Sequence, residues 1–190
     1  SVYFGMKGVQ LSAATCTWLF FGLLAYVFFF GGQTRFIIEE GITALGNLTQ
    51  NFIGLATWTD SLRTSSFPQT WTIFYWAYWM VWCVAVPFFI GSISKGRTLR
   101  QVILGGYVFG LSGTFTSFII MGNYGLGLQM HGKLDVLSSY AADGNLYHAI
   151  LDILGQLPLS KAVLVLLVLC MITFYSTSFD SITMVASTYT

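Results

Sequence analysis

The sequence predicts an all-α integral membrane protein with four membrane-spanning helices. Hydrophobic residues make up 55% of its 190 residues and charged residues only 8%, against about 25% charged residues in soluble domains. Four apolar runs are long enough to cross about 30 Å of hydrocarbon, which takes about 20 helical residues. The net charge is +1, and the basic residues are scattered, so we expect no nucleic-acid partner.

The four apolar runs cover residues 11–31, 71–93, 101–121 and 162–185. No charged residue interrupts the first three, whereas the fourth holds Asp180 near its far end. The sequence starts without methionine, lacks the features of a signal peptide and stops just after an apolar run. We therefore expect an interior segment of a single transmembrane domain.

The short loop between the second and third runs is predicted to face the cytoplasm. It carries Lys95, Arg97 and Arg100 without an acidic residue, and loops of this kind stay on the inner side of the membrane. Alternation then places residues 35–70 and 122–160 outside. These two segments hold six of the seven acidic residues.

Both outer segments contain an amphipathic pattern. In residues 36–55 and 146–157, apolar side chains recur about every three or four positions, which is typical of a helix with one apolar face. Such helices lie on the membrane surface or on the protein. Packing over the bundle is the simpler interpretation, and an outer gate or lid is the alternative.

The second run carries a row of aromatic residues. At about 100° per residue, five of them fall within an arc of roughly 100°, and Trp76 points elsewhere. The five are Trp71, Tyr75, Tyr78, Trp79 and Trp82. Aromatic belts are ordinary near helix ends, but this row continues toward the bilayer centre.

An aromatic row of this kind has two interpretations. It can be core packing, or it can bind a cation, because a ring face attracts positive charge with about 0.5–2 kcal/mol per contact. Aromatic cages are a recurrent site for quaternary ammonium ligands, which cannot donate an N–H hydrogen bond. The spacing alone leaves both interpretations open.

Two runs of the sequence resemble the signature of the betaine/choline/carnitine transporter (BCCT) family: Trp71-Thr-Ile-Phe-Tyr-Trp-Ala-Tyr-Trp-Met-Val-Trp82 and Phe89-Ile-Gly-Ser-Ile-Ser-Lys-Gly-Arg-Thr98. The similarity extends from Lys7 to Ser181. It implies a twelve-helix protein of which this segment matches roughly the seventh to tenth helices. It also implies a LeuT-like bundle of two inverted five-helix repeats, with substrate bound near the midplane.

The resemblance implies substrate contacts on the second run. Tyr78, Trp79 and Trp82 match positions that line the central substrate site of the family. Three further residues match aromatics nearer its outer entrance, namely Trp71, Tyr75 and Trp76. The family usually has tryptophan where Tyr78 stands, so the match to any particular substrate is weaker there, although the aromatic face is kept.

The fourth run ends in a polar cluster. Membrane helices satisfy single hydroxyl groups with their own backbone, but here six of nine residues are polar, namely Thr173, Ser176, Thr177, Ser178, Asp180 and Ser181. Hydroxyl and carbonyl oxygens coordinate coupling ions in transporters of this architecture. The resemblance implies that Phe174, Thr177 and Ser178 bind one sodium ion, which favours sodium symport over sodium-independent exchange of substrates.

Other charged residues are expected to have structural roles. A carboxylate facing lipid is costly, so Asp180 is expected to pair with a basic loop, such as the one containing Arg97. His131 with Asp135, and His148 with Asp152, have the spacing of neighbours on one helical face. Two ligands are thin evidence for a metal site, so surface hydrogen bonding is expected instead.

Together these features predict secondary active transport of a small quaternary-ammonium compound of the glycine betaine, choline or carnitine type. The protein is not expected to be an enzyme or to need a cofactor, with Na⁺ as the coupling ion. A sodium-independent antiporter, a membrane channel and a structural membrane subunit are the alternatives. We expect a multi-pass protein of the inner (plasma) membrane. A homo-oligomer is compatible with the sequence.

Overall fold

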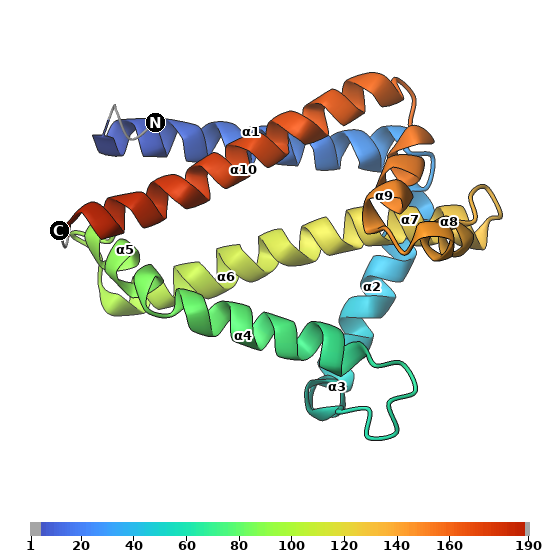
Figure 1. Ribbon diagram of the computed structural model, residues 1–190, viewed down its shortest axis with the longest axis horizontal. Helices are drawn as coiled ribbons and strands as arrows, with labels where there is room; N and C mark the ends of the chain where they lie inside the picture. The colour runs from blue at the N-terminus through green and yellow to red at the C-terminus, as the bar shows by residue number, and fades with distance from the viewer. Residues whose placement is uncertain (1–4, 189–190) are drawn as a thin grey trace.

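The computed structural model describes residues 5–188, which are helical apart from short connections. In Figure 1, α1 (Gly5–Phe30), α4 (Ile73–Trp82), α6 (Leu99–Ser117) and α10 (Ser160–Thr188) run between two ends of the molecule. At one end lie α5 and both chain termini, and at the other lie α2, α7, α8 and α9. In the described residues three helices are long and apolar enough to span a membrane, and a bent helix pair makes a fourth candidate.

The first and last helices, α1 (Gly5–Phe30) and α10 (Ser160–Thr188), pack side by side. Their contact contributes Leu23, Val27, Val163 and Cys170 to the buried core, which also includes residues of α2, α7 and α9. Near the C-terminal end of α1, the Tyr26 hydroxyl donates a hydrogen bond of 2.5 Å to the carbonyl of Pro158, just before α10 begins. The candidate spans within them, Lys7–Phe30 and Ser160–Thr183, begin slightly earlier than the predicted 11–31 and 162–185.

The second predicted span, 71–93, is bent in the structure. A π-helical turn (Pro68–Thr72) leads into α4 (Ile73–Trp82), and α5 (Ala85–Ile93) follows at an angle of 56°. Pro87 lies in the first turn of α5 and has no backbone N–H to bond the carbonyl one turn earlier. A proline in this place explains a helix break just before it.

The third span is longer than predicted. Helix α6 (Leu99–Ser117) continues through a π-helical turn (Phe118–Gly122) into α7 (Asn123–Met130), whereas the prediction ended at residue 121. Glycine disfavours helix by about 1 kcal/mol, which makes the sequence from Gly122 onward a poor helix candidate. Two of these glycines are instead sites of close packing, because a Cβ on Gly125 would lie 3.2 Å from Ile153 and one on Gly127 would lie 3.0 Å from Phe36.

The two predicted outer segments are helical, as their patterns predict, but they are divided differently. The predicted helix 36–55 is two helices, α2 (Thr34–Gln50) and α3 (Phe52–Thr57), separated at Asn51. The predicted helix 146–157 is α9 (Leu146–Gly155). A further helix, α8 (Val136–Asp143), was not predicted. Its start is capped by Asp135, which accepts a hydrogen bond from the Ser138 N–H.

Candidate functional site

The aromatic residues of α4 and of the π-helical turn before it contact one another in a row. Trp71 and Tyr75 are stacked with ring centroids 6.3 Å apart. One turn further on, the centroids of Tyr78 and Trp82 lie 5.9 Å apart, and Tyr78 also meets Trp79 edge to face at 5.9 Å. The structure therefore brings five of the six predicted substrate residues into two contacting groups on one helix.

Phe74 joins these two groups and was missed by the sequence prediction. Its ring stacks on Tyr78 at 6.1 Å and meets Tyr75 edge to face at 5.6 Å. By helical spacing Phe74 lies just outside the predicted arc, so the arc alone did not include it. The signal that could have found it is its position one turn before Tyr78.

Two of the predicted residues differ from the rest. Trp79 lies at the edge of the row, where it lines an apolar groove between α5 and α6 with residues such as Ile90 and Tyr107. Trp76 has 71% of its surface exposed and forms no ring contact within the described chain. The row proper therefore consists of Trp71, Phe74, Tyr75, Tyr78, Trp79 and Trp82.

The three predicted sodium residues lie on α10, and two of them are on the side that contacts α1. The Thr177 hydroxyl donates to the carbonyl of Thr173 at 2.8 Å and lies 3.4 Å from the hydroxyl oxygen of Ser12 on α1. Phe174 meets Phe20 of α1 edge to face, with centroids 5.4 Å apart. Ser178 is exposed. Thr177 and Phe174 are thus held in the α1–α10 contact, whereas Ser178 is not.

The aromatic row and the hydroxyl cluster lie on different parts of the described chain. Helix α10 packs mainly against α1, α9 and α5. No ring of α4 is in stacking contact with Phe174 in residues 5–188. A single site that binds both substrate and ion would therefore need residues beyond those of α4 and α10.

Two expectations for charged residues are not met. Asp180 forms no ion pair with Arg97, and its buried Oδ2 has no hydrogen-bond partner among the described residues. His131 follows the end of α7, whereas Asp135 precedes α8, so these two do not share a helical face. The helix break at Gly132, with φ of +64°, separates them.

The second pair, His148 and Asp152, does lie on one helix, α9. Asp152 accepts a hydrogen bond from the Ser139 hydroxyl of α8, which ties α8 to α9. No group of three or more metal-binding side chains occurs among the residues that the structure describes.

The chain matches the family model for betaine/carnitine/choline family transporters over residues 1–190. It is 30% identical over 184 residues to a carnitine transporter of Acinetobacter baumannii and 30% identical over 184 residues to a probable glycine betaine transporter of Desulfitobacterium hafniense. An uncharacterized transporter of Escherichia coli, YeaV, is 31% identical over 176 residues.

These matches cover 93–97% of the chain but only 33–36% of the relatives. The chain thus spans about a third of the length of the transporters that it resembles. Proteins of this family are transporters and not enzymes. The match over all 190 residues, together with the long apolar helices, shows that the chain is part of a multi-pass membrane protein and belongs to the betaine/carnitine/choline transporter family.

Proposed function

We propose that the full-length protein carries out sodium-coupled uptake of a small quaternary-ammonium compound across the plasma membrane. The observation that carries this proposal is the contacting row of rings on α4, a helix of a candidate membrane span. The printed names of two relatives, a carnitine transporter and a probable glycine betaine transporter, support the substrate class.

The chemistry of the row suits a quaternary ammonium group. Trimethylammonium has no N–H to donate, so it cannot form the hydrogen bond that an ordinary amine forms with a carboxylate. Ring faces, by contrast, attract its diffuse charge. Tyr78 touches rings on three sides, and this contact restricts its rotamers. Rings that are ordered in advance lose less conformational entropy when they bind the ligand.

The hydroxyl cluster of α10 supports sodium as the coupling ion. Because the Thr177 hydroxyl donates its only hydrogen to the Thr173 carbonyl, the lone pairs of its oxygen remain available to a cation. In the proposed ion site, Phe174 provides its backbone carbonyl oxygen and Ser178 provides its hydroxyl oxygen. The proposed scaffold is two inverted five-helix repeats, in which ion and substrate bind near the midplane.

The proposal is tested with full-length protein in proteoliposomes. Uptake of labelled glycine betaine, carnitine and choline is measured with an inward sodium gradient and with potassium in its place. Saturable uptake that requires sodium supports the proposal. Equal uptake in potassium that needs an internal substrate identifies an antiporter, and uptake that does not saturate identifies a channel.

A further inference from the structure

A polar pocket lies at the outer end of the helices, away from the aromatic row. It is formed where the turn after α1 leads into α2 and where α7 ends. Six residues line it, namely Gly32, Gln33, Arg35, Phe36, Glu39 and His131. Figure 1 shows this end, with α2 and α7 close together, opposite the end that holds the basic loop before α6.

Gln33 is the buried polar group of this pocket. Only 5% of its surface is exposed, yet its side-chain amide forms no hydrogen bond within the described chain. It is tightly held, because a Cβ on Gly127 would come within 3.2 Å of its Oε1. Its amide atoms are not fully enclosed and it lines the pocket, so the unpartnered amide is available to a ligand there.

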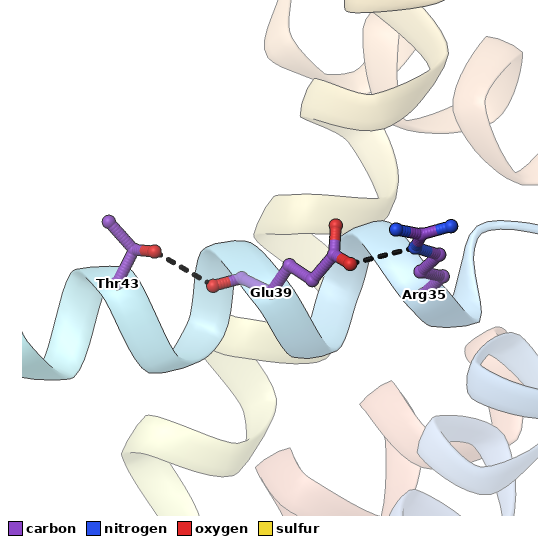
Figure 2. Close-up of polar contacts among 3 residues, drawn as sticks. All are labelled: Arg35, Glu39 and Thr43. Atoms are coloured by element: carbon purple, nitrogen blue, oxygen red, sulfur yellow. Dashed lines mark hydrogen bonds and ion pairs between the residues drawn. The ribbon is translucent and has the colours of Figure 1, made fainter.

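Arg35 provides the positive charge. Its Nε donates to Glu39 Oε1 at 2.7 Å one turn along α2, and Glu39 in turn accepts at its backbone carbonyl from the Thr43 hydroxyl (Figure 2). Arginine has five N–H donors, so this ion pair leaves the terminal NH₂ groups free for a second carboxylate. The wall therefore presents a cation and an anion next to each other.

The start of α2 adds further donors. Gln33 precedes the helix without capping it through its side chain, and the backbone N–H groups of a first turn carry partial positive charge. Phe36, in the same first turn, meets His131 edge to face with ring centroids 5.4 Å apart. The His131 Nδ1 donates to the Gly127 carbonyl at 2.7 Å, which fixes the orientation of the imidazole ring.

We propose that this pocket is a weak capture site for the zwitterionic form of the substrate, one that carries both a carboxylate and a quaternary ammonium group. The carboxylate binds the Arg35 guanidinium and the Gln33 amide N–H at the start of α2. The ammonium methyl groups lie toward Phe36 and the Glu39 carboxylate. The ligand class rests on the proposed function, but the carboxylate site rests on the pocket alone.

The pocket is expected to discriminate between substrates that share an ammonium head. Glycine betaine and carnitine have a carboxylate and choline has a hydroxyl group, so choline lacks the group that Arg35 and Gln33 bind. Arg35 and Glu39 side chains are 89% and 59% exposed, and solvent weakens charge interactions at such positions. Binding is therefore weak, and it decreases with added salt.

The test uses full-length protein carrying Trp82→Leu, so that binding at the aromatic row is impaired. Saturation-transfer NMR on the methyl signals of glycine betaine and of choline measures weak binding. We expect betaine to bind more tightly than choline. In the same background, Arg35→Gln should weaken betaine binding about three- to fivefold and leave choline unchanged. Gln33→Ala should weaken betaine in the same way.

Arg63→Gln is the matched control, because it removes the same charge from an exposed outer loop that does not line the pocket. Equal effects of Arg35→Gln and Arg63→Gln, or equal binding of betaine and choline, would overturn the capture site. Displacement of betaine by inorganic phosphate but not by carnitine would mean a simple anion site and would also overturn it. If Gln33→Ala fails to fold, the result for Arg35→Gln, at an exposed position, decides alone.

The two proposals fail in different ways. If no weak betaine binding depends on Arg35, while the tighter binding still depends on Trp82, only the capture site is refuted. Persistence of the Arg35-dependent component, with no effect of Trp82→Leu on tighter binding, refutes only the aromatic site of the proposed function.

Discussion

The hydroxyl oxygens of Ser12 and Thr177 lie 3.4 Å apart, although 165 positions separate the two residues in the sequence. This contact joins the first and last membrane helices at the place where α10 is richest in hydroxyl groups. Since each hydroxyl oxygen has two acceptor lone pairs, the pair brings two hard oxygen ligands together between the helices.

We therefore expect Thr177→Ala to raise the sodium concentration that gives half-maximal uptake. If the neutral hydroxyl ligand contributes about 1–1.5 kcal/mol to sodium binding, its loss should raise this concentration about five- to tenfold. Uptake by the full-length protein, titrated with sodium at fixed ionic strength, measures the effect. The control is Thr173→Ala, one turn earlier, whose hydroxyl donates to the carbonyls of Leu169 and Cys170. If both variants have the same sodium dependence as wild type, Thr177 is not an ion ligand.

The aromatic row predicts a graded response at Trp82. Phenylalanine keeps a smaller negative ring face and should weaken substrate affinity modestly, whereas leucine keeps apolar bulk without that face. If the desolvated contact contributes about 2 kcal/mol, Trp82→Leu should lower substrate affinity about thirtyfold. Binding of glycine betaine to purified full-length protein, normalised to the folded fraction, measures both variants.

A matched control for that series is Trp18→Leu on α1, because 78% of the Trp18 surface is exposed and it lies outside the row. It should leave affinity unchanged. Equal affinities of wild type, Trp82→Phe and Trp82→Leu, with a shared loss of thermal stability, would support core packing instead of cation binding.

Gly31 and Gly22 should respond in opposite ways to alanine. A Cβ on Gly31 would lie 2.5 Å from the Val27 carbonyl and 2.7 Å from the Tyr124 ring, whereas nothing lies within 4 Å of a Cβ on Gly22. Overpacking costs about 1–3 kcal/mol, so Gly31→Ala should lower the Tm. Gly22→Ala, inside α1, should be neutral or stabilise by up to about 1 kcal/mol. Thermal unfolding in detergent compares them, and an equal Tm for the two variants contradicts the prediction.

Asp60 is expected to hold the loop before the aromatic helix in place. Burial by itself raises the pKa of this carboxyl, but hydrogen bonds from Ser65, Thr64 and Ser66 outweigh burial and lower the pKa from 3.8 to about 2. Because the folded loop favours the ionised form, its stabilisation is present above about pH 4 and is lost as the pH falls toward 2.

Hydrogen exchange of residues 58–67, corrected for the intrinsic pH dependence, should therefore lose protection between pH 4 and 2. Asp60→Asn should lack this change and should expose the bond after Arg63 to trypsin at pH 8. Asp135→Asn, which removes a cap from a different outer helix, is the control and should leave cleavage there unchanged. An unchanged cleavage rate in Asp60→Asn would mean that the carboxylate does not order the loop.

The basic loop between α5 and α6 is predicted to face the cytoplasm. In a background with the exposed Cys83 replaced by serine, an impermeant thiol reagent applied to intact cells should modify Leu62→Cys, a position 87% exposed in the outer loop. It should modify Lys95→Cys only after the membrane is permeabilised. Labelling of Lys95→Cys in intact cells would reverse the topology.

Several features could be predicted from the sequence because they depend on residues close together in the chain. Hydropathy over about 20 positions located the spans, and helical spacing located the row from Trp71 to Trp82. The family signature lies within these same local patterns. The start of α8 was harder to predict from the sequence. Its first N–H groups donate to the side chains of Asp135 and Gln129, and Gln129 lies in α7, before the intervening turn.

Only the tertiary structure decided where helices continue and which faces meet. Gly125 and Gly127 lie in a sequence that favours a break, yet α7 continues because α9 and α2 pack against it through the space left by the missing side chains. The contact between Ser12 and Thr177 and the pocket around Gln33 likewise join segments distant in sequence. Local propensity amounts to about 1 kcal/mol per residue, whereas close packing of distant helices sums many contacts and outweighs it.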